Sequence, residues 1–365
     1  MATGLRDTTS LVMLTGWDAA ELHKFTLRDG TTYAAIVSEL NRALAALNAE
    51  LANDSLWAGL VSFTDQPDIE YRIGASNGML QHTEYGRPDA KRADTEGHML
   101  PLLKWDRMLG WTWDYLKDAR LEQVQADLTD AIKDVRDRWR IQILSRLLKR
   151  GDDSGVHKGL GSSGYSPGFA TTAAQTNVDY TPPANGGTTF ASTHEHYVGS
   201  AGGAFVNGDF QDCRDELREH GHEPPFDFLI GPSDVTAVKA LSDFTPADSP
   251  LLIPGLTADR ARVSQDYIGT IHDFAVREVR GIPQYYGFAF KSYGPRSQRN
   301  PIRVRLEKGT RSPAFIAMPD PRAGNGLVPL QHLMVYGEFG VGVADRSAGT
   351  ARYNNNVTWA DGTAT

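Results

Sequence analysis

Residues 121–150 read LEQVQADLTDAIKDVRDRWRIQILSRLLKR and carry the clearest periodic pattern in the chain. Apolar side chains recur at steps of three or four residues, at Leu121, Val124, Leu128, Ile132, Val135, Trp139, Ile143 and Leu147. This spacing is typical of one buried face of a helix, and no Gly or Pro interrupts it. At about 1.5 Å per residue the helix would be roughly 45 Å long. We therefore predict a spine helix that packs with one face against a sheet or a second helix.

The residues that precede the spine predict three different structures. Residues 1–30 have no clear period and suggest an extended arm. Residues 31–53 predict an amphipathic helix, because their apolar side chains again recur at steps of three and four. Thr31 or Thr32 can cap the start of this helix, since a hydroxyl oxygen accepts hydrogen bonds from the first backbone N–H groups.

A long hairpin is predicted between residues 56 and 108. Residues 68–73 alternate polar and apolar side chains, as in a half-exposed strand, and residues 98–105 suggest a second strand. The stretch between them is polar and charged, with a turn signal at Gly86-Arg87-Pro88-Asp89. Because an isolated two-stranded hairpin is only marginally stable in water, we expect this one to lie on another subunit.

The remainder of the chain predicts a mixed α and β region. Residues 151–208 are rich in Gly, Ser, Thr and Pro and suggest loops or weakly patterned strands. Regular alternation follows, with helices at 210–220 and 235–241, strands at 226–230, 268–279, 284–293, 302–307 and 314–318, and a loop-rich stretch at 242–262. The runs 333–343 and 351–359 are predicted to form a final antiparallel pair.

Composition excludes several classes of protein. The chain has 365 residues, 40% of them hydrophobic and 22% charged, as in an ordinary globular protein. It shows no signal peptide pattern and no apolar run of membrane-spanning length, so we expect a protein that stays in a cytoplasm. The net charge of −8 argues against tight DNA binding. The single cysteine, Cys213, can form no intrachain disulfide and is interpreted as an incidental thiol on a helix.

Two histidine pairs are the best candidates for metal chemistry. They are His194-Glu195-His196 and His220-Gly221-His222. Histidines two residues apart face the same way only on a strand, whereas helical metal sites usually space them by four. We therefore interpret all four as polar loop residues and expect no metal, no cofactor and no catalytic residues. Neither a phosphate-binding loop nor a nucleophile elbow is present in the sequence.

The order of these parts resembles the HK97-type major capsid protein of tailed bacteriophages. Three short motifs support the resemblance: Phe228-Leu229-Ile230-Gly231-Pro232-Ser233-Asp234, Gly281-Ile282-Pro283, and Tyr336 to Val343 with Asp345-Arg346. Each motif is weak alone, but their order covers residues 30–360. The resemblance implies an α+β fold with an N-terminal arm (1–30), a helix (31–55), an E-loop hairpin (56–108), a peripheral domain with the spine helix (109–200), an axial domain (201–330) and returning C-terminal strands (331–365).

The resemblance also implies a function. The chain would be a non-enzymatic subunit that assembles with itself into pentamers and hexamers, forming an icosahedral virion shell in the host cytoplasm. Scaffolding, portal and decoration proteins are the expected partners, and packaged double-stranded DNA would be held only non-specifically. The expected assembly interface consists of Glu84, Arg87, Asp89, Lys91, Arg92, Asp94 and Glu96 in the hairpin.

Three alternatives remain open at this point. A cellular nanocompartment (encapsulin-like) shell would share the fold. A metal-dependent enzyme would use His194, His196, His220 and His222. A tail-tube or other virion protein is disfavoured by the spine helix. The sequence also leaves covalent cross-linking open, with Lys91 and the run 354–356 as candidates, although solvated surface side chains are the preferred interpretation of both.

Overall fold

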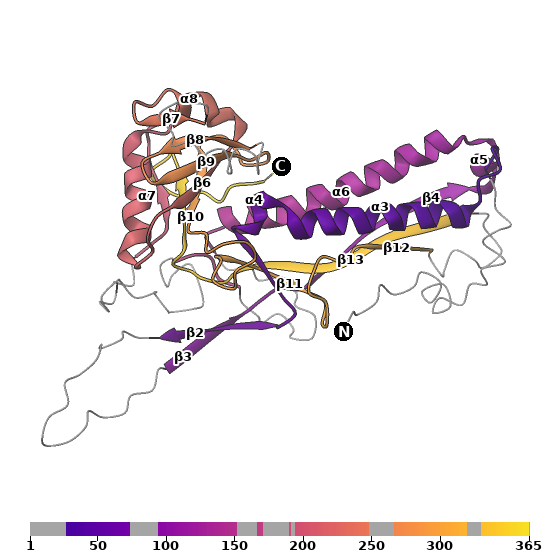
Figure 1. Ribbon diagram of the computed structural model, residues 1–365, viewed down its shortest axis with the longest axis horizontal. Helices are drawn as coiled ribbons and strands as arrows, with labels where there is room; N and C mark the ends of the chain where they lie inside the picture. Colours follow the sequence, from indigo (N-terminus) through magenta and orange to yellow (C-terminus); the bar gives the residue numbers. More distant parts are fainter. Residues whose placement is uncertain are drawn as a thin grey trace, which may run out of the picture. The chain divides into compact units, whose positions relative to one another are not determined.

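The computed structural model describes residues 27–73, 94–151, 166–170, 190, 194–247, 266–319 and 330–364 (Figure 1). Its backbone contacts divide into two compact units. Unit 1 contains Met1–Asn53, Leu103–Trp139 and Thr310–Phe339, and unit 2 contains Asp54–Leu102, Arg140–Gly309 and Gly340–Thr365. Within the described ranges, no helix combines the length and the apolar character that a membrane crossing requires.

Helix α3 (Tyr33–Asn53) belongs to unit 1 and confirms the first predicted helix. The hydroxyl of Thr32 accepts a hydrogen bond from the backbone N–H of Ala35 at 3.2 Å, as a helix cap should. Two asparagines on α3 bond to strand β12 (Ile316–Pro319) or to the residue before it. Asn41 donates to the carbonyl of Ala317 and Asn48 to that of Phe315, each at 2.9 Å. These hydrogen bonds from the asparagine side chains fix the helix along the strand.

Helix α6 (Leu121–Leu148) is the spine that the sequence predicts, shorter by two residues at its C-terminal end. Its buried face follows the predicted stripe, with Ala131 taking the place of Ile132: Val124, Leu128, Ala131, Val135, Trp139, Ile143 and Leu147. In unit 1 the ring of Trp139 lies 4.8 Å from that of Phe339 and 6.5 Å from that of Phe315. At Trp139 the apolar stripe therefore packs on aromatic residues of unit 1, as expected for a spine helix.

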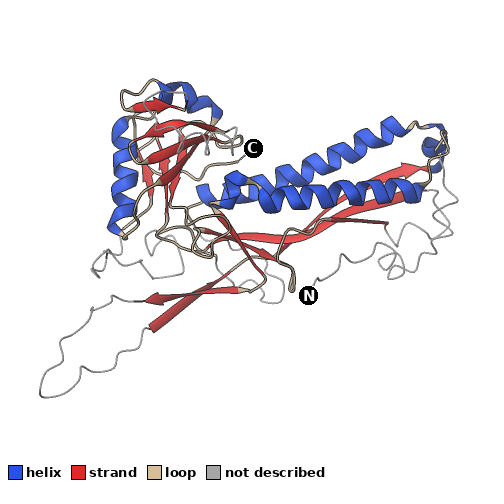
Figure 2. Cartoon of the chain, in the orientation of Figure 1, coloured by secondary structure: helices blue, strands red, loops and turns tan. Residues whose placement is uncertain are grey.

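Those strands form an antiparallel arrangement around β13 (Leu330–Val343). In unit 1, β13 pairs on one side with β4 (Leu103–Thr112) in a ladder from Leu330↔Thr112 to Phe339↔Leu103. On its other side it pairs with β12. The short helix α5 (Trp113–Asp118) follows β4 and is capped by the hydroxyl of Thr112. Figure 2 shows these helices and strands by type.

The largest sheet lies in unit 2 and has seven strands in the order β5-β14-β10-β6-β9-β8-β7. The strands are β5 (Tyr197–Gly199), β6 (Phe226–Ile230), β7 (Phe244–Pro246), β8 (Tyr267–Ile271), β9 (Phe274–Glu278), β10 (Tyr286–Phe290) and β14 (Gly349–Tyr353). Helix α7 (Asn207–Glu219) packs on β14 and β10. A 3-10 turn (Pro232–Asp234) leads from β6 into helix α8 (Val235–Lys239). The core between α7 and the sheet is rich in phenylalanine, including Phe205, Phe210, Phe226, Phe228 and Phe274.

Unit 2 also contains a short helix, α4 (Ser55–Ala58), two strands of the five-stranded sheet to which β13 belongs, and one separate strand pair. Strand β1 (Val61–Thr64) runs parallel to β11 (Ile302–Leu306). Strand β2 (Asp68–Ile73) runs antiparallel to β3 (Asp94–Met99).

Three strand predictions are wrong in detail. The run 98–105 divides into β3 and β4, because Pro101, which lacks a backbone N–H, interrupts it. The run 268–279 is a hairpin of β8 and β9, whose turn places His272 at a positive φ of 49°. The final pair does not form: β13 and β14 lie in different sheets, and β14 pairs with β10 and β5 instead.

Candidate functional site

The hairpin is the first candidate, because its strands form a two-stranded sheet of their own. Their register runs from Asp68↔Met99 to Ile73↔Asp94. Of the predicted interface residues, Glu84, Arg87, Asp89, Lys91 and Arg92 lie outside the described residues. Asp94 and Glu96 lie in β3, opposite Ile73 and Tyr71. The first strand of the hairpin is therefore confirmed, the second lies at Asp94–Met99 instead of 98–105, and the roles of the charged residues remain a prediction.

The base of the hairpin is held by hydrogen bonds that the sequence did not predict. The Nε2 of the buried His98 lies 2.7 Å from the carbonyl oxygen of Val343. The backbone N–H of Leu100 donates to the carbonyl of Pro67 at 2.7 Å, and Arg305 donates to the carbonyl of Leu100 at 2.8 Å. These bonds tie the base of the hairpin to neighbouring residues of unit 2.

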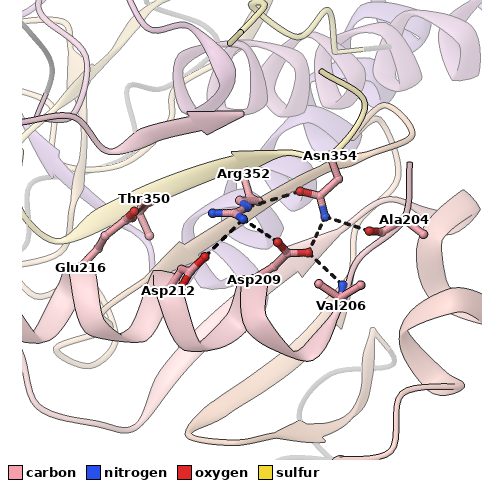
Figure 3. Close-up of polar contacts among 8 residues, drawn as sticks. All are labelled: Ala204, Val206, Asp209, Asp212, Glu216, Thr350, Arg352 and Asn354. Carbon is pink, nitrogen blue, oxygen red and sulfur yellow. Dashed lines mark hydrogen bonds and ion pairs between the residues drawn. The ribbon is translucent and has the colours of Figure 1, made fainter. Parts of the chain in front are cut away.

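A buried polar network connects α7 to β14 and the residues after it (Figure 3). Arg352 donates to Asp209 at 2.6 Å, and its second carboxylate partner is Asp212 at 3.3 Å. The amide of Asn354 donates to the other oxygen of Asp209 at 2.6 Å and to the carbonyl of Ala204 at 3.3 Å. Asp209 also accepts the backbone N–H of Val206 at 2.8 Å, which caps the helix. The expectation that Asn354 is a solvated surface residue is wrong, because its side chain is fully buried.

Glu216 extends this polar face by one more helical turn (Figure 3). Its carboxyl group is hydrogen-bonded to the hydroxyl of Thr350, and the same hydroxyl lies 3.1 Å from the carbonyl oxygen of His196. Burial raises the pKa of Glu216 to about 7. A hydroxyl has only one proton, so a protonated Glu216 can donate to Thr350 while Thr350 donates to His196.

Cys213 lies on α7, as the sequence predicts, and its side chain is buried in the phenylalanine-rich core. Burial raises the pKa of its thiol well above the ordinary value. A thiol that stays protonated is a poor nucleophile, so Cys213 is a packing residue.

Three of the four candidate histidines converge in unit 2. The Nε2 of His194 lies 3.1 Å from that of His196 and 2.9 Å from that of His220, and the last two atoms are 2.9 Å apart. Glu219 joins them, with a carboxylate oxygen 3.5 Å from His194. His222 lies elsewhere, between the hydroxyls of Tyr293 and Ser347. All three lie in loops or turns, as the sequence predicts, but the spacing argument did not predict that they lie together.

One feature of the sequence does indicate this cluster. His194 and His196 immediately precede strand β5, where residues two apart do face the same side. The contribution of His220 requires the fold itself, since it follows the last residue of α7 and is 24 residues from His196.

Comparison with known proteins identifies the fold. No family model matches the chain, and no curated protein matches it. Among solved structures, a chain from Mycobacterium phage Patience is similar, with a TM-score of 0.66, 18% identity, and 94% of this chain and 93% of that chain covered. The capsid of the native GTA particle is similar with a TM-score of 0.50, 15% identity, and coverage of 82% and 89%. With its long α6, its separate β2–β3 hairpin and its seven-stranded sheet, this chain has the HK97-type fold of tailed-phage major capsid proteins.

Proposed function

We propose that the chain is the structural subunit of an icosahedral shell that encloses double-stranded DNA. The main support is the HK97-type fold, which extends over 94% of the chain in the similarity to the phage protein. The hairpin is a second support. Among the described residues, β2 and β3 pair only with each other, and such a ribbon gains stability when it lies on another molecule.

Self-association into pentamers and hexamers is the central part of this proposal. The charged hairpin residues would fix the register between neighbouring subunits more than they add affinity. Scaffolding, portal and decoration proteins are further proposed partners. The net charge of −8 suits a wall that encloses DNA without binding it tightly. We also propose that the protein has no enzymatic activity and that its place is the virion, after assembly in the host cytoplasm.

Electron microscopy of the purified full-length protein tests the proposal. We expect closed shells, or rings of five or six subunits. A protein that stays monomeric by light scattering at every concentration and salt tested would contradict it. Particles isolated from the native source distinguish the two kinds of shell. Nuclease-resistant DNA inside them supports a virus, whereas an enclosed protein cargo supports a nanocompartment.

A further inference from the structure

The histidine cluster has an arrangement that hydrogen bonding alone satisfies poorly. The Nδ1 of His196 lies 2.8 Å from the carbonyl oxygen of Gly349. A carbonyl can only accept, so this nitrogen carries the proton and the Nε2 of His196 presents a lone pair to the cluster. A ring held by a backbone carbonyl in this way is typical of metal-binding histidines.

The remaining two nitrogens cannot complete the triangle well. Each neutral imidazole nitrogen offers either one proton or one lone pair, and the Nε2 of His196 offers a lone pair. If only one of His194 and His220 carries a proton on its Nε2, the other two nitrogens would have to share that proton. If both carry one, two N–H groups would face each other across 2.9 Å. A cation at the centre instead uses a lone pair from every ring.

The cluster is enclosed on one side. The side chain of His196 is fully buried. The ring of Phe190 covers the cluster, stacking on His194 with ring centroids 4.0 Å apart. Neutral imidazoles in an enclosed space are the form in which histidine binds a metal.

The fourth group supplies negative charge. Glu219 is the last residue of α7 and its side chain is 40% exposed, so the cluster opens toward solvent on this side. The carbonyl groups at the C-terminal end of a helix also carry partial negative charge, which favours a cation. The ligand atoms of the four residues all lie within 4.8 Å of one another.

We propose that the three Nε2 atoms of His194, His196 and His220, with the carboxylate of Glu219, bind a divalent transition-metal ion, with Zn²⁺ as the best fit. Three nitrogens and one oxygen match the four-coordinate preference of zinc, and imidazole suits metals of this kind. Tetrahedral bonds of about 2.0–2.1 Å would place the ligand atoms about 3.3 Å apart. The three nitrogens need to separate by only a few tenths of an ångström, while the partly exposed carboxylate of Glu219 would move inward.

The ion would act as a structural link within unit 2. All four positions of a tetrahedral ion would be filled by protein, which is characteristic of structural rather than catalytic zinc. The link joins the end of α7 to the segment that enters β5. The neighbouring Glu195 pairs with Arg150 at 2.8 Å, so this segment is tied to the protein on both sides. The proposal is independent of whether the shell holds DNA or a protein cargo.

Metal analysis of the untagged full-length protein tests the site. We expect about one zinc per chain after growth with Zn²⁺, and a melting temperature that falls on chelation and recovers when Zn²⁺ alone is added back. His220→Gln should lose the stoichiometric zinc and weaken zinc binding at least tenfold, since even groups that merely support ligands contribute 10- to 100-fold. Its melting temperature should no longer respond to Zn²⁺.

The matched control is His222→Gln, two residues away but bonded to Tyr293 and Ser347. This variant should keep its zinc even if its melting temperature falls. It therefore distinguishes a loss of zinc binding from a general loss of stability. The absence of saturable zinc binding in the wild type would overturn the proposal. Equal binding by wild type and His220→Gln would overturn it too, since the zinc would then lie elsewhere.

Discussion

The guanidinium group of Arg352 lies 2.6 Å from the carboxylate of Asp209, and both side chains are more than 90% buried. The pair joins β14 to the first turn of α7. Burying two charges is costly, and the cost is offset only because Asn354 and the backbone of Val206 satisfy the remaining carboxylate oxygen. The network therefore contributes most to stability while it is complete.

Asp209→Ala should destabilise the subunit by about 3–5 kcal/mol, because it leaves the buried Arg352 with the exposed Asp212 as its carboxylate partner and a 3.3 Å hydrogen bond to Asn354. Urea unfolding followed by tryptophan fluorescence measures the change. The control is Arg42→Ala, which removes an exposed ion pair with Glu39 and should cost less than about 1 kcal/mol. Equal losses of unfolding free energy in the two variants would show that the buried Asp209 network contributes no more than an exposed ion pair.

Leu128→Asp should prevent stable folding of unit 1. Leu128 is 6% exposed on the packed face of α6, and an unpaired carboxylate there would cost about 3–5 kcal/mol. Circular dichroism and solubility report the outcome. Asp130→Asn, on the exposed face of the same helix, should behave as wild type. A soluble, cooperatively folded Leu128→Asp protein would mean that this face is not a core face.

Glu216→Gln should change how stability depends on pH. The pKa of Glu216 is raised from 4.5 to about 7, so the folded state holds a proton that the unfolded state releases between these values. The contribution of Glu216 to the free energy of unfolding is therefore fully present below pH 4.5 and is lost as the pH rises from 4.5 through 7. Relative to the variant, the wild type should lose on the order of 3 kcal/mol across this window. Parallel pH profiles of the two unfolding free energies would contradict the raised pKa.

Shortening the hairpin should separate folding from assembly. Replacing residues 74–93 by Asn-Gly joins Ile73 to Asp94, which already face each other, through a two-residue turn suited to a hairpin. The subunit should keep its melting transition but fail to form stable shells, as judged by sedimentation.

A second variant examines the charges alone. Changing Arg87, Lys91 and Arg92 to Glu keeps the length of the hairpin, and it should weaken assembly more at low salt than at high salt, because salt screens exposed charges. Normal shells from the shortened protein would show that the hairpin does not hold subunits together.

Local pattern was enough to predict most of the helices and strands. The period of α6 and α3 depends on neighbours three and four residues apart, and the alternation in β2 is visible within six residues. The pairing of strands that are far apart in the chain could not be predicted from the sequence. β13 and β14 are adjacent in the chain, and a hairpin was the simplest expectation. Their partners come from distant segments, with β4 pairing to β13 and β10 to β14.

The same limit applies to the polar clusters. Asn354 resembles its exposed neighbours Asn355 and Asn356 in sequence, and only the position of Asp209 on α7 makes it a buried residue. The convergence of His220 on His194 likewise depends on where α7 ends. The overall fold can be predicted without these details, because the order of the helices and strands along the chain does not depend on which strands pair.

The burial of Cys213 has a practical consequence. The chain has one cysteine, and in the folded protein its thiol is enclosed and protonated. A cysteine introduced at an exposed position such as Val357, which is 70% exposed, would then be the one readily alkylated by a maleimide dye in the native subunit. A second dye would attach only after unfolding. The ratio of dyes per chain would thus report opening of the free subunit directly.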